Sequence, residues 1–228
     1  MKDIWDGMPN DHLLADVSLW SANLANLEES VRRVDPYADL YHIDVSDSHF
    51  TENLLFFPDL VAAIRATTRK PLHVHLMVER PLHHIPRFVE AGADIITVHL
   101  ENGPEVRDCL LRIGQENCAA GLAIQLETDL QTATPFLDLV ELVLLMGTPL
   151  GIKGQSASPE AYSRLRAMKR TLNTSGLAER VKVAADGGIR KEAVPRFREA
   201  GADIVVPGSL VFKSDDIAAT FRWLRSIG

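Results

Sequence analysis

The sequence contains little of several features that would place it in a particular class. Only two of its 228 residues are cysteines, Cys109 and Cys118, and no CxxC motif is present. Two cysteines are too few for a disulfide framework, and each lies beside apolar residues, so we expect both to be reduced packing residues. Lysine and arginine number 24 against 31 aspartates and glutamates, a formal net charge of −7. This balance argues against a general nucleic-acid-binding protein, because phosphate contacts need a basic face.

Long apolar runs are also lacking. No stretch approaches the roughly 20 consecutive apolar residues that cross a membrane. Residues 1–12 do not show the basic and then apolar order of a secretory signal peptide. We therefore expect a cytoplasmic protein without a membrane role. The composition, 46% hydrophobic and 24% charged, is ordinary for a globular chain of this length.

What is present is a repeated alternation of two patterns. Short apolar runs alternate with longer segments in which apolar residues recur every three or four positions, as in strand–helix units. Continuous runs such as LVELVLLM suit strands that are buried on both faces of a parallel sheet. The eight predicted strands cover residues 13–19, 40–45, 72–77, 95–100, 119–126, 142–146, 181–185 and 204–207, and a helix is expected after each.

An internal repeat indicates how these units are arranged. Residues 86–95 read PRFVEAGADI and residues 195–204 read PRFREAGADI, with nine of ten positions identical at an offset of 109. Each copy ends a helix at a glycine, Gly92 or Gly201, and leads into the fourth or the eighth strand. Chance reuse of a favourable turn is the alternative explanation. Eight units in about 220 residues fit a single (β/α)8 TIM barrel better than a doubly wound sheet. We predict a barrel over 13–228, preceded by an N-terminal extension over 1–12.

Chemistry in such a barrel lies where the strands end, and polar residues gather there. His42 and Asp44 lie two apart at the end of the second strand, as do His73 and His75 at the end of the third, so each pair shares a face. Alone, each histidine would be interpreted as a hydrogen-bonded core residue, but together they favour a metal site. A mixed nitrogen and oxygen set suits Zn, Fe(II), Mn or Co better than Mg or Ca. Further polar residues at strand ends are Ser18, Ser21, Asp186, Gly187, Gly188, Gly208 and Ser209.

At these strand ends the chain resembles the ribulose-phosphate 3-epimerase family. The segments that carry the resemblance are HIDVSDSHF at 42–50, HVHLM at 73–77, ADGGI at 185–189, SLWSANLANL from Ser18, AGADIITVHLE from Ala91, the Gly-Gln of GIKGQS at 151–156 and VPGSLVF from Val206. Each is weak alone, but together they are specific and span nearly the whole barrel. The resemblance implies an isomerase of carbohydrate metabolism that epimerises C3 of a ketose phosphate. It would convert D-ribulose 5-phosphate to D-xylulose 5-phosphate, or act on a related ketose phosphate, through a metal-stabilised enediolate.

The resemblance also implies the roles of individual residues. One divalent metal ion (Zn, Fe(II), Mn or Co) would be held by His42, Asp44, His75 and Asp186, with no organic cofactor. Asp44 and Asp186 would act as acid and base, because inversion beside a carbonyl needs a proton removed from one face and returned to the other. The implied partners are a small phosphorylated ketose and further copies of the chain, as a dimer or hexamer. The implied substrate-binding residues are Ser21, Met77, Met146, Gly151, Gly154, Gln155, Gly187, Gly188, Gly208 and Ser209.

Several residues at the barrel mouth depart from the usual family pattern. His73 stands where the family generally has Asp, and Lys153 stands for Gly in a lid after the sixth strand. The other departures are Asn23 for Asp, Ser46 for Met, Ser48 for Gly, Phe57 for Gly, Gly-Thr-Pro-Leu at 147–150 for Ser-Val-Asn-Pro, and Ile152 for Phe. They leave open a different substrate, such as a hexulose or tetrulose phosphate. Lys153 is then either an anion contact or simply a solvated side chain.

Other functions remain as alternatives. Decarboxylases of this barrel type carry an Asp-x-Lys-x-x-Asp run, whereas Asp44-Val45-Ser46-Asp47 has no lysine. A Schiff-base aldolase needs a buried strand lysine near the mouth, and Lys182 lies at the wrong end. A catalytically silent sugar-phosphate binder is the remaining rival, although binding alone does not need two acid–base carboxylates. For the other histidines we expect supporting hydrogen bonds from His49 and His99. His73 either orients a ligand or faces the interior one layer down.

Overall fold

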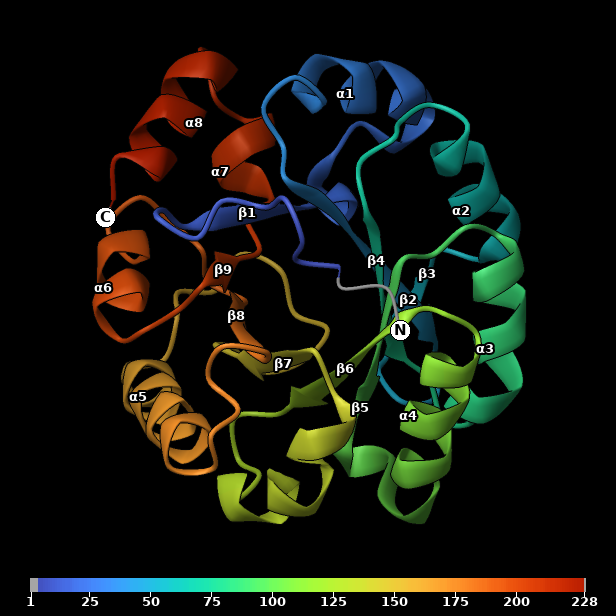
Figure 1. Cartoon of the computed structure of the whole chain (residues 1–228). Helices are drawn as coiled ribbons and strands as arrows, with labels where there is room; N and C mark the ends of the chain where they lie inside the picture. The colour runs from blue at the N-terminus through green and yellow to red at the C-terminus, as the bar shows by residue number, and fades with distance from the viewer. Residues whose placement is uncertain (1–3, 228) are drawn as a thin grey trace.

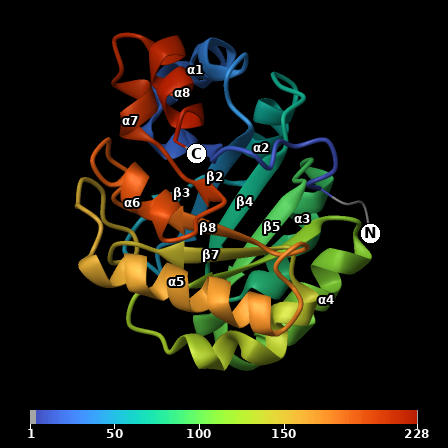
Figure 2. The same cartoon turned by 60° about the vertical axis from the view of Figure 1, so that its left-hand side comes forward.

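The computed structural model describes residues 4–227. Over these residues eight parallel strands close into a barrel with helices outside it, which confirms the predicted (β/α)8 fold (Figure 1, Figure 2). Strands adjacent in the chain pair with one another, and β1 closes the barrel by pairing with both β9 and β2. The barrel strands are β1 (Leu14–Ser18), β2 (Leu40–Asp47), β4 (Leu72–Met77), β5 (Ile95–His99), β6 (Ala119–Ile124), β7 (Leu142–Met146), β8 (Lys182–Asp186) and β9 (Ile204–Val205).

The outer layer departs from the prediction in one place. A helix was expected after every strand, but the segment after β6 is a 3-10 helix, η4 (Leu130–Leu139), which contains Pro135. The α-helices are α1 (Leu27–Val34), α2 (Pro58–Arg65), α3 (Pro81–Glu90), α4 (Val106–Gln115), α5 (Pro159–Thr174), α6 (Val194–Glu199), α7 (Ser209–Phe212) and α8 (Ile217–Arg225). The shorter 3-10 segments are η1 (Leu19–Ser21), η2 (Leu24–Asn26) and η3 (Leu100–Glu105).

Three strand ends lie two residues from their predicted positions, and β1, β5 and β8 differ from prediction by one residue at one or both ends. β6 ends at Ile124 and not at 126. β2 runs two residues further, to Asp47, because the short strand β3 (Leu54–Leu55) pairs antiparallel with its end. β9 stops at Val205, two residues before the predicted end at Pro207. Both cysteines are free and buried, as expected.

The N-terminal end of the barrel is filled by apolar side chains at the strand starts. This floor consists of Leu14, Leu40, Ile95, Ala119, Leu142 and Ile204, all buried. Ile4 is buried against the same cluster, and Trp5 and Met8 pack on it. The Trp5 indole N–H also donates to the backbone carbonyl of Glu141 (3.2 Å). In Figure 1 the N-terminal segment accordingly lies over the middle of the barrel. This covers the floor and leaves the other end of the barrel for chemistry.

The repeated AGAD segment has the same role in both halves. Gly92 and Gly201 adopt positive φ values of 95° and 100°. The aspartate that follows, Asp94 or Asp203, accepts a hydrogen bond from the backbone N–H at the start of the preceding strand (3.0 and 2.8 Å). Each also pairs with a cation of an outer helix, Arg65 or Lys169. The repeat therefore belongs to the scaffold.

Candidate active site

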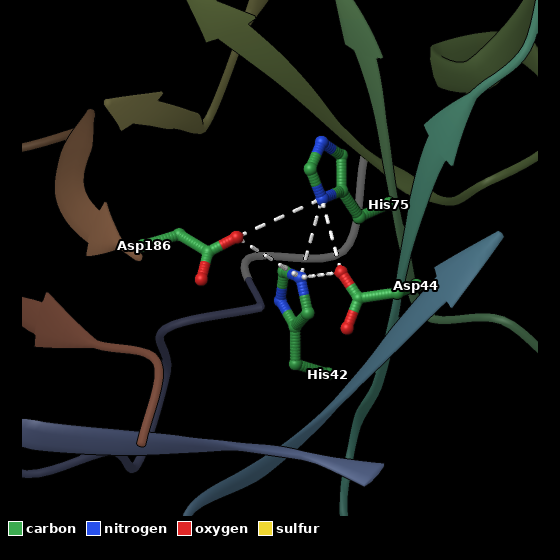
Figure 3. Close-up of side chains that lie close together, drawn as sticks. All are labelled: His42, Asp44, His75 and Asp186. Carbon is green, nitrogen blue, oxygen red and sulfur yellow. Dashed lines mark hydrogen bonds and ion pairs between the residues drawn. The ribbon is translucent and has the colours of Figure 1, made fainter. Parts of the chain in front are cut away.

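Four side chains from three strands converge at the carboxyl end of the barrel (Figure 3). We name His42, Asp44, His75 and Asp186 the four-residue cluster. His42 and Asp44 project from the same face of β2, and His75 lies beside Asp44 on the neighbouring strand β4. Asp186 ends β8 and reaches the cluster from another side of the barrel. Both histidines are fully buried, and the side chain of Asp186 is the most exposed, at 15%.

The distances within this cluster match those between ligands of one metal ion. The His42 Nε2 atom lies 3.2 Å from Asp44 Oδ1 and 3.3 Å from His75 Nδ1. His75 Nδ1 lies 3.4 Å from Asp44 Oδ1, and Asp186 Oδ2 lies 3.7 and 3.9 Å from the two histidines. Ligand atoms ~2.1 Å from a zinc-sized ion at tetrahedral angles are ~3.4 Å apart. The cluster therefore fits a single divalent ion.

The charges of the cluster also favour a cation. Burial raises the pKa of Asp186 to about 7; His42 opposes this shift, and the carboxylates of Asp44 and Asp16 add to it. Burial lowers the pKa of His42, but Asp44 and Asp16 outweigh it and hold that pKa well above its usual value. Burial raises the pKa of Asp44, yet His42 and His75 reverse the shift and keep it well below its usual range. Two carboxylates that are largely shielded from solvent need a nearby positive charge to offset the cost of their desolvation.

A hydrogen-bond chain holds His75. Its Nε2 lies 2.8 Å from His99 Nε2, and His99 Nδ1 lies 3.0 Å from Glu101 Oε2. Glu101 in turn accepts from the backbone N–H of Gln125 and from the Thr128 hydroxyl. If His99 donates to Glu101 and accepts from His75, the Nδ1 lone pair of His75 faces the cluster. Sequence reasoning missed the role of Glu101, although its spacing of two residues from His99 was a signal.

The other histidine predictions have mixed outcomes. The supporting role expected for His99 is confirmed by its contact with His75. The same prediction is wrong for His49, whose exposed ring makes no hydrogen bond among residues 4–227. His73 does face the interior one layer below the cluster, where it contacts Asp16. Sequence reasoning missed Asp16, because one charged residue inside the buried strand LADVS gives no periodic signal.

A cavity above the cluster is lined by Asp44 and Asp186 and by every residue predicted to bind substrate. These are Ser21, Met77, Met146, Gly151, Gly154, Gln155, Gly187, Gly188, Gly208 and Ser209, together with Lys153. Trp20 and Arg190 also line it and were not predicted. Gly188 has φ 71°, and a Cβ there would lie 2.2 Å from the Ala157 backbone nitrogen, so this loop requires glycine.

The segment 147–155, here named the lid, is fastened to three parts of the rim. Lys153 Nζ donates to the Trp20 carbonyl (2.6 Å) and lies 4.3 Å from the centre of the Trp20 ring. Arg190 donates to the Gly154 carbonyl (2.6 Å), and Asn53 donates to the Gly151 carbonyl (2.6 Å). The lid thus lies closed over the edge of the cavity.

Comparison with known proteins agrees with this site. Residues 14–212 match the model of the ribulose-phosphate 3 epimerase family. The chain belongs to this family. It is 36% identical to the ribulose-phosphate 3-epimerase of Chlamydia trachomatis over 213 residues, covering 93% of this chain and 91% of that protein. The identity is 34% with the Escherichia coli protein of the same name over 211 residues, covering 92% and 93%. The chain is thus an isomerase-class enzyme, a sugar-phosphate epimerase.

Solved structures show the same fold at much lower identity. The 3-keto-L-gulonate-6-phosphate decarboxylase of Vibrio cholerae aligns with a TM-score of 0.68 and 17% identity, covering 94% of this chain and 97% of that one. A 3-hexulose-6-phosphate synthase aligns with a TM-score of 0.62 and 18% identity, covering 95% and 99%. These neighbours support the barrel alone. Within residues 4–227 no helix has the length and apolar character needed to cross a membrane.

Proposed function

We propose that this epimerase inverts C3 of a ketose phosphate, D-ribulose 5-phosphate or a close relative, by moving protons through Asp44 and Asp186. The observation that carries the proposal is that two carboxyl groups approach one cavity from different sides. Asp44 comes from β2 and Asp186 from β8, with β1 and β9 between them. Inversion beside a carbonyl needs one group to remove a proton from one face and a second to deliver a proton to the other.

The two carboxyl groups have different basicities, which suits this division of labour. Asp44 is held ionised, with a pKa well below its usual range, by His42 and His75. Burial raises the pKa of Asp186 to about 7, so before a metal ion binds it carries a proton part of the time near neutral pH. When their environments push the pKa values of two carboxyl groups apart in this way, one group can act as the base and the other as the acid. In one direction of the reaction Asp44 removes the C3 proton and Asp186 returns one, and in the other the roles reverse.

The four-residue cluster would hold one divalent ion, Zn, Fe(II), Mn or Co. Its mixture of two imidazoles and two carboxylates suits these ions. When bound, the ion supplies Lewis-acid chemistry, polarising the substrate ketone so that the neighbouring C–H becomes more acidic. His42 and His75 serve only as ligands in this scheme, because they are fully buried beneath the cavity.

The remaining cavity residues would bind the rest of the substrate. Gly187, Gly188, Gly208 and Ser209 would present backbone N–H groups to the phosphate, since loops without a Cβ allow a close approach. Met77 and Met146 are nearly fully buried and would form an apolar wall that keeps water from the reacting carbon. The lid changes at 147–153 are the reason to test hexulose and tetrulose phosphates beside the pentulose.

The test is the incorporation of solvent deuterium at C3, followed by NMR, over a panel of ketose phosphates with metal-replete and chelated protein. We expect metal-dependent exchange with one member of the panel. Asp44→Asn and Asp186→Asn should each abolish it, whereas the exposed Asp138→Asn control keeps it. Exchange that persists in either site variant would contradict the acid–base assignment. Absence of exchange with every sugar would favour the alternative of a catalytically silent barrel.

A further inference from the structure

A second buried layer of polar side chains lies directly below the four-residue cluster. It consists of Asp16 on β1, His42 on β2, His73 on β4 and Thr97 on β5, each no more than 1% exposed. Asp16 Oδ2 lies 3.1 Å from His42 Nδ1 and 2.6 Å from His73 Nδ1. His73 Nε2 lies 2.7 Å from the Thr97 hydroxyl. His42 is the only member shared with the cluster above.

The contacts fix which nitrogen of each ring carries the proton. A carboxylate oxygen can only accept, so both Nδ1 atoms that face Asp16 must donate to it. The Thr97 hydroxyl then donates to His73 Nε2. With its proton on Nδ1, His42 presents the lone pair of Nε2 to Asp44, His75 and Asp186. Asp16 therefore selects the tautomer in which His42 can bind a cation.

This lower layer is a set of hydrogen bonds and not a second metal site. The 2.6 Å between Asp16 Oδ2 and His73 Nδ1 is a hydrogen-bond length, shorter than the ~3.4 Å between two ligands of one tetrahedral ion. A single carboxylate oxygen serves both rings, and the other, Asp16 Oδ1, is buried without a hydrogen-bond partner among the described residues. Such a half-satisfied buried carboxylate costs stability, which indicates a functional reason for it.

His42 has a neighbour of this layer on each side. His73 lies directly beside it in the register of β2 and β4, and the two Nδ1 atoms are 3.3 Å apart. Asp16, on β1 at the other side of His42, supplies the carboxylate, and His73 hydrogen-bonds to it. We therefore expect a carboxylate placed at position 73 to face the same ring nitrogen. On the neighbouring strand β6, Gly121 leaves room for the Thr97 side chain of this layer, because a Cβ at Gly121 would lie 1.9 Å from the Thr97 hydroxyl oxygen.

We propose that Asp16 is the positioning residue for the metal ligand His42, and that His73 braces the Asp16 carboxylate. The inference rests on the metal site of the proposed function. It predicts that loss of the Asp16 carboxylate damages metal binding, and that a carboxylate placed at position 73, beside His42, restores it.

The experiment compares Zn2+ and Co2+ affinity, by competition with a chelator, and the visible spectrum of the Co2+-loaded protein. Asp16→Asn should lower affinity about 10- to 100-fold and alter the Co2+ spectrum. The double variant Asp16→Asn/His73→Asp should recover wild-type affinity to within about threefold and restore the spectrum. Glu141→Gln is the matched control: it neutralises another buried carboxyl group, which accepts from the Ala120 N–H near the floor of the barrel. It should leave affinity and spectrum unchanged.

Wild-type affinity and spectrum in folded Asp16→Asn would overturn the positioning role. A double variant that folds but binds metal as weakly as Asp16→Asn would overturn the idea that a carboxylate facing His42 Nδ1 positions this ligand. If Asp16→Asn does not fold, 15N-histidine NMR of the wild-type protein decides: protons on Nδ1 of His42 and His73 support the inference, and a proton on Nε2 of metal-loaded His42 overturns it. A wild-type protein that binds no divalent ion would refute the metal site of the proposed function, while the His73 tautomer would still report the Asp16 contact.

Discussion

Protons and a cation compete for the same atoms in the four-residue cluster. Asp44, facing Nε2, and Asp16, facing Nδ1, raise the pKa of His42 well above its usual value, although burial opposes them. Asp186, with a pKa that burial raises to about 7, holds a second proton near neutrality. A metal ion that uses both atoms must displace these protons, so its apparent affinity depends on pH.

We therefore expect metal affinity to fall as the pH is lowered from 8 to 6. Below the pKa of a ligand, each displaced proton weakens apparent binding roughly tenfold per pH unit. Because burial raises the pKa of Asp186 to about 7, the part of this loss that comes from Asp186 begins near pH 7, well above the ordinary range of a carboxyl group. Chelator competition at pH 8, 7 and 6 measures it. A flat profile would show that neither proton is displaced.

At the scale of elements, the lid makes a hydrogen bond and a cation–π contact that its sequence did not predict. Lys153 was a candidate anion contact, and in the structure its ammonium group donates to the Trp20 carbonyl and lies over the Trp20 ring. The anion role stays a prediction. A lysine that fastens the lid and a lysine that binds phosphate have different consequences, so the two can be separated.

We expect Lys153→Ala to raise the KM for the phosphorylated substrate about tenfold, the effect of losing one charge-assisted hydrogen bond. Steady-state kinetics measure it, and unchanged kinetics would remove the role. Trp20→Leu keeps the lysine and removes the ring beneath it. Its hydrogen bond to the carbonyl at position 20 remains in that variant, so if Lys153 fastens the lid through the Trp20 ring, Trp20→Leu reproduces the change in KM. If Lys153 binds the anion, the KM of Trp20→Leu stays near the wild-type value, and inhibition by inorganic phosphate is weakened only in Lys153→Ala.

The elements also show what the sequence could predict. β4 and β7 have their predicted bounds because each is a short apolar run. The four-residue cluster was predictable because polar residues at strand ends break those runs. Asp16 was not predictable, because its partners His42 and His73 lie on other strands, 26 and 57 residues away along the chain. The parallel pairing of β1 with β2 places the carboxylate beside His42, but which side chain of β1 reaches that ring cannot be read from the sequence.

At the scale of the whole molecule, the two ends of the barrel are divided between stability and chemistry. The N-terminal segment covers the floor through Ile4, Trp5 and Met8, and the cavity lies at the opposite end of the strands. Substitutions at the floor should therefore change the free energy of unfolding with little effect on the reaction.

Ile4→Ala tests this division. Removing a buried isoleucine side chain leaves unfilled space, and because a terminal segment can readjust, we expect a loss of roughly 1–3 kcal/mol in the free energy of unfolding. Urea denaturation measures the loss, and kcat should stay within about twofold of the wild-type value. An Ile4→Ala protein as stable as the wild type would show that the segment contributes no packing energy. A large fall in kcat with unchanged stability would contradict the division between the two ends.

The residues of the four-residue cluster come from β2, β4 and β8, and nearly half of the chain separates His75, the last of the first three, from Asp186. A nascent chain still on the ribosome has His42, Asp44 and His75 in place long before β8 has been translated. The complete cluster can form only when β8 has joined the sheet, while α6, β9, α7 and α8 are still to follow. If the cluster holds a metal ion as proposed, a nascent chain binds the ion weakly until β8 is in place, and the bound ion then opposes reopening of the barrel.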